Sequence, residues 1–420
     1  MDNNFFGNSL LIAPLFLLSA KYHIVVLCTP SFIMHTPDPI VFHIFVIFTG
    51  SAILATLALY ARQALLVGYI IWGIILGPSA FAIIEDTELI NNIAQIGIIF
   101  LLFLLGLNLQ PQDLLHTVKK TTVVTLVSSL IFAILGFAIG QIFSFGFWES
   151  VLIGASVMFS STIIGLKLLP TTVLHHKHAG EVMVSILLLQ DLIAIVVLLI
   201  LQGGGTSLID VVLLVLGLPL LIGFALLFER FVLVKLISRF DKIQEYIFLI
   251  TIGWCLGMAE LATYLSLSHE IGAFIGGIVL ATSPIARFIA ESLKPVRDFF
   301  LVIFFFALGA SLDLNIVYTV LIPSLILAAT MLTIKPFLFK YLMVKVGEQT
   351  DLSLEMGFRL GQISEFSLLI AVVALNTGVI SDKASYLIQS ATIMTFIVSS
   401  YFIVLKYPTP IAVSDRLRRD

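Results

Sequence analysis

The stretch from Val182 to Leu201, which reads VMVSILLLQDLIAIVVLLIL, decides the fold. A helix rises 1.5 Å per residue, so this stretch is long enough to cross the ~30 Å hydrocarbon core of a bilayer. Gln190 and Asp191 stand near its middle. Burying an unpaired carboxylate there costs about 3 kcal/mol or more. Asp191 is therefore expected to pair, to line a watery cavity or to change its protonation state, and each alternative indicates handling of ions or protons.

The composition places the whole chain in a membrane. Of its 420 residues, 60% are hydrophobic and only 11% are charged, which is more apolar surface than a soluble core needs. Cys28 and Cys255 lie in separate apolar stretches, so neither a disulfide nor a cysteine-based metal site is expected. No cofactor is expected, and nucleic acid is not an expected partner. Because no phosphate-binding glycine loop is present, a pump driven by ATP within this chain is not expected either.

Thirteen apolar segments follow one another along the chain. They lie near 39–60, 64–83, 91–109, 122–145, 150–168, 182–202, 210–231, 246–265, 271–285, 298–313, 317–338, 355–377 and 386–406. Residues 1–37 form an N-terminal extension that holds either an extra or interfacial helix or no spanning segment. We therefore predict an all-α polytopic membrane protein with thirteen transmembrane helices.

The basic residues predict the orientation of these segments. Eighteen lysines and arginines follow the odd-numbered segments, whereas the connections after the even-numbered segments contain one, Lys383. Connections rich in lysine and arginine stay in the cytoplasm. We therefore expect the first segment to start outside and the tail, residues 408–420, to lie inside.

The chain also repeats itself. Residues 68–77 (GYIIWGIILG) resemble residues 272–281 (GAFIGGIVLA), residues 100–109 (FLLFLLGLNL) resemble residues 303–312 (IFFFALGASL), and FSS at 159–161 has a weaker counterpart in FSL at 366–368. The shift is seven segments, an odd number, so the second copy is inverted. We predict a first repeat at 38–203, a linker helix with a basic loop at 204–241, and a second repeat at 242–407. Inverted repeats are typical of secondary transporters, although chance similarity between apolar helices is the alternative.

Asp191 is the first candidate for a cation and proton site. A cation and a proton compete for one carboxylate, because a nearby cation lowers its pKa and desolvation raises it. Gln190 adds an amide oxygen, a hard ligand that suits an alkali ion. We predict a monovalent metal cation at Asp191 and Gln190. The alternatives are an aspartate locked by hydrogen bonds and a glutamine that only packs between helices.

Two further segments carry polar groups that favour broken helices. Ser160, Ser161 and Thr162 can bond to backbone carbonyls and support a local unwinding, or they can serve only as polar contacts between helices. Gln362 and Glu365 occupy the symmetry-related segment. We expect a second break there, with Glu365 in a structural or relay role rather than as a direct ligand.

Lys335 lies late in the eleventh segment, next to Pro336. It can act as a charge partner of Asp191 or take the place of the ion in the empty state. Alternatively, its amine reaches to the cytoplasmic interface a few residues away. The sequence leaves both interpretations open.

Several segments together resemble the membrane domain of the monovalent cation:proton antiporter-2 family, in particular its Kef-type potassium efflux transporters. They are GY at 68–69 through GP at 77–78, IGIIFLLFLLGLNL ending at 109, SST at 160–162, LLLQDLIAIVVLL at 187–199, Met258 with Glu260 and Leu261, IGAFIGGIVLA at 271–281, FFFALGASLDL at 304–314, and Gln362 to Phe366. The resemblance covers about residues 40 to 405. Kef-type proteins continue into a nucleotide-binding regulatory domain, whereas this chain stops at Asp420, so gating by glutathione or nucleotide is not carried over.

The resemblance implies a fold, an assembly and a mechanism. It implies an NhaA-like homodimer in the bacterial inner membrane, with inverted repeats and crossed broken helices in segments 5 and 12. A scaffold would hold segments 1–3 and 8–10, and a mobile core would hold segments 4–6 and 11–13. The core would slide against the scaffold in an elevator-type exchange of a cation for protons. The Gln-Asp pair favours potassium over sodium, and a separate regulatory subunit is an open possibility.

We therefore predict a proton-coupled antiporter rather than an enzyme. A sodium/proton antiporter is the alternative within the class. A gated potassium channel or efflux pathway is the alternative from another class, and would show uncoupled flux at high rates. A symporter for anionic solutes would need an arginine or helix N-termini aimed at the substrate, and no arginine lies at a confident midplane position.

Overall fold

The computed structural model describes residues 39–84, 88–108, 111–167, 178–202, 208–240, 243–265, 267–283 and 285–409. Within these ranges every regular element longer than one residue is helical. The predicted N-terminal extension lies outside the described residues, as does the tail from residue 410 onward.

Each of the thirteen predicted segments contains at least one helix. The helices are α2 (Pro39–Tyr60), α3 (Leu65–Leu76), α4 (Glu88–Asn108), α5 (Pro111–Ile142), α6 (Phe147–Ser156), α7 (Thr162–Lys167), α9 (His178–Gln202), α10 (Leu208–Phe228), η1 (Glu229–Leu233), α11 (Val234–Arg239), α12 (Gln244–Tyr264), α13 (His269–Ala281), α14 (Ala286–Ala310), α15 (Leu314–Lys345), α16 (Thr350–Arg359), α17 (Glu365–Asn376) and α18 (Asp382–Lys406). Six of them are long and apolar enough to cross a membrane by length and composition. The count of thirteen spanning helices stays a prediction.

Some helices extend beyond the apolar segments. The segment predicted from 298 is part of α14, which begins at Ala286. Its first turns bury Ala286, Ile289, Ala290 and Leu293. This spacing is that of one apolar stripe on a helix whose other face is polar. A criterion based on uniformly apolar runs misses such a stripe.

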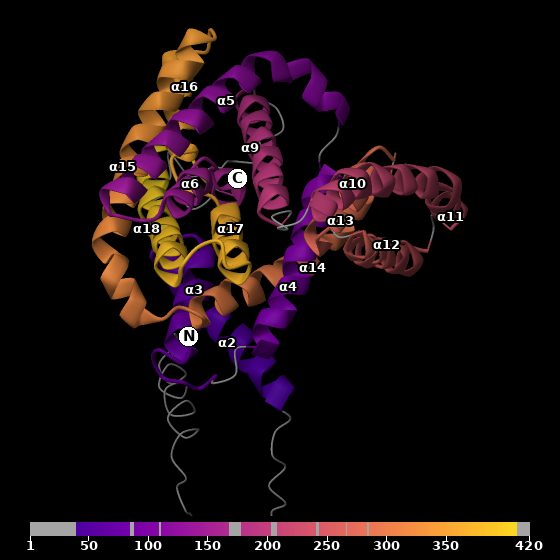
Figure 1. Ribbon diagram of the computed structural model, residues 1–420, viewed down its shortest axis with the longest axis horizontal. Coiled ribbons are helices and arrows are strands. Elements are labelled where there is room, and N and C mark those ends of the chain that lie inside the picture. Colours follow the sequence, from indigo (N-terminus) through magenta and orange to yellow (C-terminus); the bar gives the residue numbers. More distant parts are fainter. Residues whose placement is uncertain are drawn as a thin grey trace, which may run out of the picture.

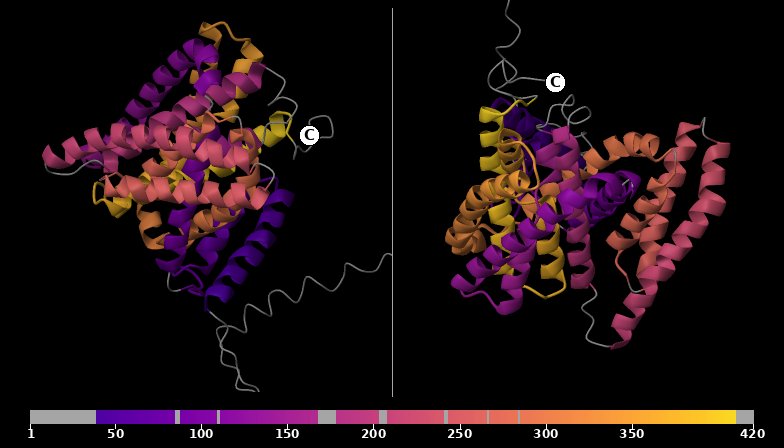
Figure 2. Two further views of the ribbon diagram at one scale, coloured as in Figure 1. Left: turned by 90° about the vertical axis from the view of Figure 1, so that its right-hand side faces the viewer. Right: turned by 90° about the horizontal axis from the view of Figure 1, so that it is seen from above.

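The helices gather in two groups by their packing (Figure 1). One group holds α5, α6, α9 and α15 to α18, in which α15 packs against α18 and α16, and α5 packs against α6 and α9. The other holds α2, α3, α4 and α12 to α14, in which α4 lies between α13 and α14. The second view in Figure 2 places α10 and α12 together at one side of the molecule. We call the first group the core and the second group the scaffold.

Four glycines bring the scaffold helices into reciprocal contact. A Cβ at Gly73 of α3 would lie 2.1 Å from the carbonyl oxygen of Phe306 in α14, and a Cβ at Gly277 of α13 would lie 2.1 Å from that of Phe103 in α4. In the same way, Gly106 faces the oxygen of Phe274 at 2.4 Å, and Gly309 faces that of Ile70 at 2.1 Å. The members of each pair occupy equivalent positions of the two quoted sequence repeats. Two repeats related by a twofold axis would produce this reciprocity.

Candidate functional site

Two helices are interrupted where the core is most deeply buried. The first break lies between the end of α6 at Ser156 and the start of α7 at Thr162, and the second lies between α16 and α17, at 360–364. A helix that stops leaves carbonyl groups at one end and N–H groups at the other without partners in the helix. The predicted breaks in segments 5 and 12 are both present.

Side-chain hydrogen bonds join the two breaks. Ser160 Oγ donates to the carbonyl oxygen of Leu360 at 2.8 Å, and Gln362 Nε2 donates to that of Ser161 at 3.3 Å. The hydroxyl of Ser367 donates to the carbonyl oxygen of Ser156. Segments about 200 residues apart in sequence are therefore bonded to each other at their breaks, and we call this place the crossing.

Asp191 of α9 lies fully buried beside this crossing. Thr162 Oγ1 lies 3.2 Å from one carboxylate oxygen of Asp191 and 3.4 Å from the other. Thr162 is also the first residue of α7. The carboxylate and the hydroxyl offer only oxygen donors, which are the ligands that alkali cations and protons share.

Gln190 is bonded to the first break. Its Oε1 accepts a hydrogen bond from the N–H of Ser160 at 3.0 Å, and its Nε2 donates to the carbonyl oxygen of Met158 at 3.3 Å. The amide thus bridges the unwound residues from both sides. An amide oxygen has two lone pairs, so Oε1 keeps capacity for a second partner while it holds the backbone in place.

Lys335 of α15 is fully buried, and its amine lies at the crossing. It donates to the carbonyl oxygen of Phe159 at 2.6 Å and to that of Gln362 at 3.2 Å, and it lies 5.1 Å from the centre of the Phe132 ring. Because no ion pair within 4.0 Å involves Lys335 in the described part of the chain, it is not directly paired with Asp191 in this conformation. The amine is therefore enclosed by the protein in this conformation.

The second break carries the other predicted residues. Gln362 uses both ends of its amide, since Nε2 also donates to the oxygen of Arg359 at 2.8 Å and Oε1 accepts from Ser399 Oγ at 3.0 Å. Glu365, the first residue of α17, is half-buried and interacts electrostatically with Asp191. The structure thus gathers all of the predicted site residues at the crossing, with Asp191 and Thr162 in direct contact.

Sequence reasoning missed several residues that hold the second break. Thr395 of α18 accepts a hydrogen bond from the N–H of Ile363 at 3.1 Å. Buried Arg359 lies 2.8 Å from Glu355, and it donates to the carbonyl oxygen of Pro408 at 2.8 Å. Arg359, early in segment 12, was a signal, because a buried guanidinium needs several acceptors. The threonines and serines of α18 carried no pattern that set them apart.

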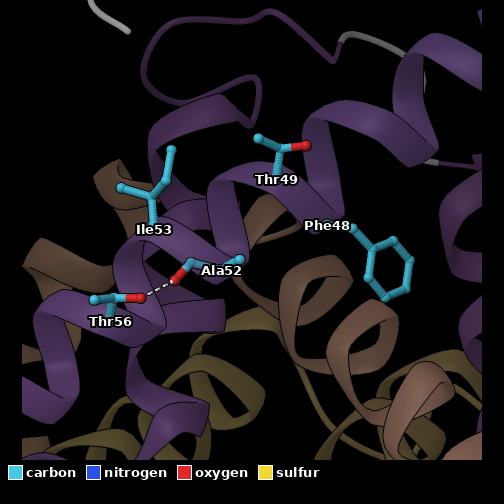
Figure 3. Close-up of a pocket in the computed structure, with 5 residues that line it drawn as sticks. All are labelled: Phe48, Thr49, Ala52, Ile53 and Thr56. Carbon is cyan, nitrogen blue, oxygen red and sulfur yellow. Dashed lines mark hydrogen bonds between the residues drawn. The ribbon is translucent and has the colours of Figure 1, made fainter. Parts of the chain in front are cut away.

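A depression of about 510 Å³ on α2 is not a candidate for the exchange site. Its five lining residues, Phe48, Thr49, Ala52, Ile53 and Thr56, belong to one helix, and none is ionisable (Figure 3). Thr56 donates to the carbonyl oxygen of Ala52 within that helix, at 2.7 Å. The depression therefore has no group that could carry a proton.

Two interrupted helices that are bonded at their breaks, beside a buried carboxylate, are typical of secondary transporters. Residues 44–406 match the family described as sodium/hydrogen exchanger, transmembrane. The chain belongs to this family, and its relatives place it among monovalent cation:proton antiporters.

Curated relatives and a solved structure agree with this assignment. The chain is 28% identical over 356 residues to the iron transporter MagA of Paramagnetospirillum magneticum, covering 81% of this chain and 80% of that protein. It is 27% identical over 371 residues to the glutathione-regulated potassium-efflux system protein KefC of Salmonella schwarzengrund, covering 86% of this chain and 59% of that protein. The fold is similar to that of a solved structure, the sodium proton antiporter MjNhaP1 from Methanocaldococcus jannaschii at pH 8, with a TM-score of 0.69 at 16% identity. The similarity covers 86% of this chain and 95% of that one, and it supports the fold.

Proposed function

We propose that this protein exchanges a monovalent cation for protons at Asp191. One observation carries the proposal: the buried carboxylate of Asp191 stands beside the crossing of two interrupted helices, with the hydroxyl of Thr162 on its oxygens. A buried carboxylate without a permanent cationic partner is stable when it holds either a proton or a metal cation. Exchange follows if the protein changes its access only in these two loaded forms.

The surrounding charges favour an exchange of one ion for one proton. Lys335 is engaged with the carbonyl oxygens of Phe159 and Gln362, where it offsets the negative ends of two half-helices. Gln190 is uncharged and holds the first break. In this proposal Asp191 alone alternates between cation and proton, Glu365 keeps a structural or relay role, and the exchange is electroneutral.

Potassium is the favoured cation. The support is the Gln190-Asp191 pair and the similarity to relatives named as potassium-efflux proteins, such as KefC and the K(+) efflux antiporter 6 of Arabidopsis thaliana. Sodium is the second candidate, because the solved structure of similar fold is a sodium proton antiporter. The chain spans about three fifths of the length of the potassium-efflux relatives, whose gating properties are not part of the proposal.

The exchange would proceed by an elevator movement of the core against the scaffold. The support is that packing between helices is dense within each group, whereas α18 and α3 are the main helices in contact between them in the described part of the chain. We further propose a homodimer in a bacterial inner membrane, with the C-terminal side of α18 in the cytoplasm. The basic residues after the odd-numbered segments support that orientation.

Proton flux in proteoliposomes tests the proposal. A pH gradient is imposed, and potassium, sodium, lithium or ferrous iron is added in turn to vesicles that contain wild type, Asp191→Asn or Asp351→Asn. Asp351 is an exposed carboxylate in the first turn of α16 and serves as the matched control. We expect potassium to release the gradient in wild type and in the control, and at least 100-fold slower release in Asp191→Asn, since a fixed amide binds no proton.

The alternatives give different results in the same assay. Release by sodium alone would assign the protein to the sodium exchangers and remove Gln190 as a guide to selectivity. Potassium flux that ignores the pH gradient would indicate a channel. Full exchange by Asp191→Asn, with a thermal unfolding midpoint equal to that of wild type, would refute the mechanism.

A further inference from the structure

A cavity of about 490 Å³ is lined by residues of the core, none of which belongs to the crossing. Three parts of the chain line it: the turn between α5 and α6, the beginning of α15, and the turn before α18. The basic residues assign this end of the molecule to the outer side of the membrane. The proposed exchange does not use this cavity.

Two opposite charges line the cavity, Glu149 and Lys383. The carboxylate of Glu149 is held in place, because it accepts hydrogen bonds from the N–H of Gly146 at 3.0 Å and from the N–H of Ser381 at 2.9 Å. Burial disfavours its charged form, but the hydrogen bonds from Ser381 and Gly146 outweigh burial and lower the pKa of Glu149. Glu149 therefore carries a negative charge at neutral pH, and its oxygens keep lone pairs for one more donor.

Lys383 does not neutralise this carboxylate. In the described part of the chain, no ion pair within 4.0 Å joins the two side chains. Lys383 lies in the first turn of α18, and the residue before that helix, Ser381, makes no side-chain cap to it. The N–H groups of a first turn and a neighbouring ammonium attract an anion. Asp382, in the same turn, is exposed and is not among the lining residues.

Much of the remaining wall is apolar. Phe143, Phe145, Val320 and Pro323 contribute to it, as does Ile322, whose side chain is 66% exposed on the outer face of α15. Thr319 and Pro323 lie one to three turns inside α15, so the cavity extends from the depth of lipid headgroups to that of the first acyl carbons. A soluble ion would match the charges but not this wall.

We propose that this cavity binds the headgroup of an aminophospholipid, with its ammonium on Glu149, its phosphate on Lys383 and the first turn of α18, and an acyl chain along α15. A primary ammonium fits better than a trimethylated one, because it donates hydrogen bonds to the carboxylate. A headgroup with only a phosphate leaves Glu149 without a cation. Phosphatidylethanolamine therefore fits, whereas phosphatidylcholine and phosphatidylglycerol each satisfy one end of the site.

Lipid titration of the delipidated, full-length protein in detergent tests this site. Native mass spectrometry measures the fraction of protein that carries phosphatidylethanolamine, phosphatidylcholine or phosphatidylglycerol at matched concentrations. The variants are Lys383→Gln, which removes the phosphate partner, and Thr319→Trp, which fills the cavity from an exposed position. Lys345→Gln is the control, because it removes a basic residue from the last turn of α15, at the other end of the helix that carries Thr319.

We expect wild type to bind phosphatidylethanolamine at least threefold more tightly than the other two lipids. Lys383→Gln should lower that affinity roughly threefold, as expected for one exposed charge. Thr319→Trp should abolish the preference, and Lys345→Gln should leave it unchanged. Equal binding of the three lipids, a preference for phosphatidylglycerol, or an unchanged preference in Thr319→Trp would each overturn the proposal. The exchange assay is independent of this result.

Discussion

At the residue scale, the crossing contains a buried acid, Asp191, and a buried base, Lys335, whose partners differ. The half-helices α6 and α16 each end near the crossing with a partial negative charge of about half an elementary charge. The ammonium of Lys335 lies on one carbonyl from each break and so offsets both. Asp191 has only the hydroxyl of Thr162 among the side-chain donors described above. We propose that the base is structural and that the acid is left for the exchanged ion.

Replacing Lys335 should therefore lower the stability of the protein, and this effect should outweigh any change in ion selectivity. In Lys335→Met, two buried carbonyl groups lose their donor, which costs roughly 1–3 kcal/mol for each. We expect the unfolding midpoint of the purified protein to fall clearly below that of Lys345→Met, in which the changed residue lies in the last turn of α15. The measurement is thermal unfolding in detergent. Equal midpoints for the two variants would contradict the structural role of Lys335.

At the element scale, glycines set the distance between the scaffold helices. Gly277 lies so close to the carbonyl oxygen of Phe103 that a methyl group there would overlap with the backbone. Gly257 of α12 has no atom within 4 Å of an added Cβ. The two helical glycines thus differ only in what they face.

A pair of glycine substitutions separates close packing from helix propensity. Gly277→Ala should destabilise the protein by about 1–3 kcal/mol or more, because the neighbouring backbone must shift. Gly257→Ala should be neutral or should stabilise by up to about 1 kcal/mol, because alanine favours a helix. Thermal unfolding of both variants, with the yield of folded protein, checks this order. A Gly277→Ala variant as stable as Gly257→Ala would show that α13 and α4 are farther apart than described.

At the scale of the whole molecule, the core and the scaffold meet at the end of α14. The hydroxyl of Tyr386 in α18 donates to the carbonyl oxygen of Ser311 at 3.1 Å, while Ser79 on the scaffold side donates to the oxygen of Leu312 at 2.7 Å. Ser311 and Leu312 lie just before α15, where the chain passes from scaffold to core. A movement of the core would strain or break the bond of Tyr386.

Removing this hydrogen bond should favour the other conformations of the core. A hydrogen bond contributes about 0.5–1.5 kcal/mol, so Tyr386→Phe should change the ratio of conformations roughly three- to tenfold. We expect faster hydrogen exchange of the amides at 311–316 than in Tyr401→Phe, which alters an exposed tyrosine of the same helix. Unchanged exchange in Tyr386→Phe would mean that this contact does not hold the core.

Much of this organisation could be predicted because the membrane imposes it. A lipid environment requires long apolar helices, so the run around Asp191 and the other segments were visible in the sequence. The Ser160–Thr162 cluster and the residues around Gln362 indicated the two breaks for a similar reason, since unwound backbone needs polar partners. By contrast, Lys335 remained ambiguous, because its partners are carbonyl groups, which every residue has. No feature of the sequence around Thr395 indicated that its hydroxyl holds the second break.

The sequence by itself determined the class, the apolar segments and the position of the acidic group, because the cost of burying polar groups in lipid acts on each segment separately. Only the tertiary structure decided which groups meet. It placed the amine of Lys335 on the carbonyl oxygens of Phe159 and Gln362, and the amide of Gln190 on the backbone of the first break. It also placed Glu149 and Lys383 in the wall of one cavity. These partners are brought together by the packing of helices that are distant in the chain. Their contacts use backbone groups or residues at the same depth in the membrane, and such contacts leave no periodic pattern in the sequence.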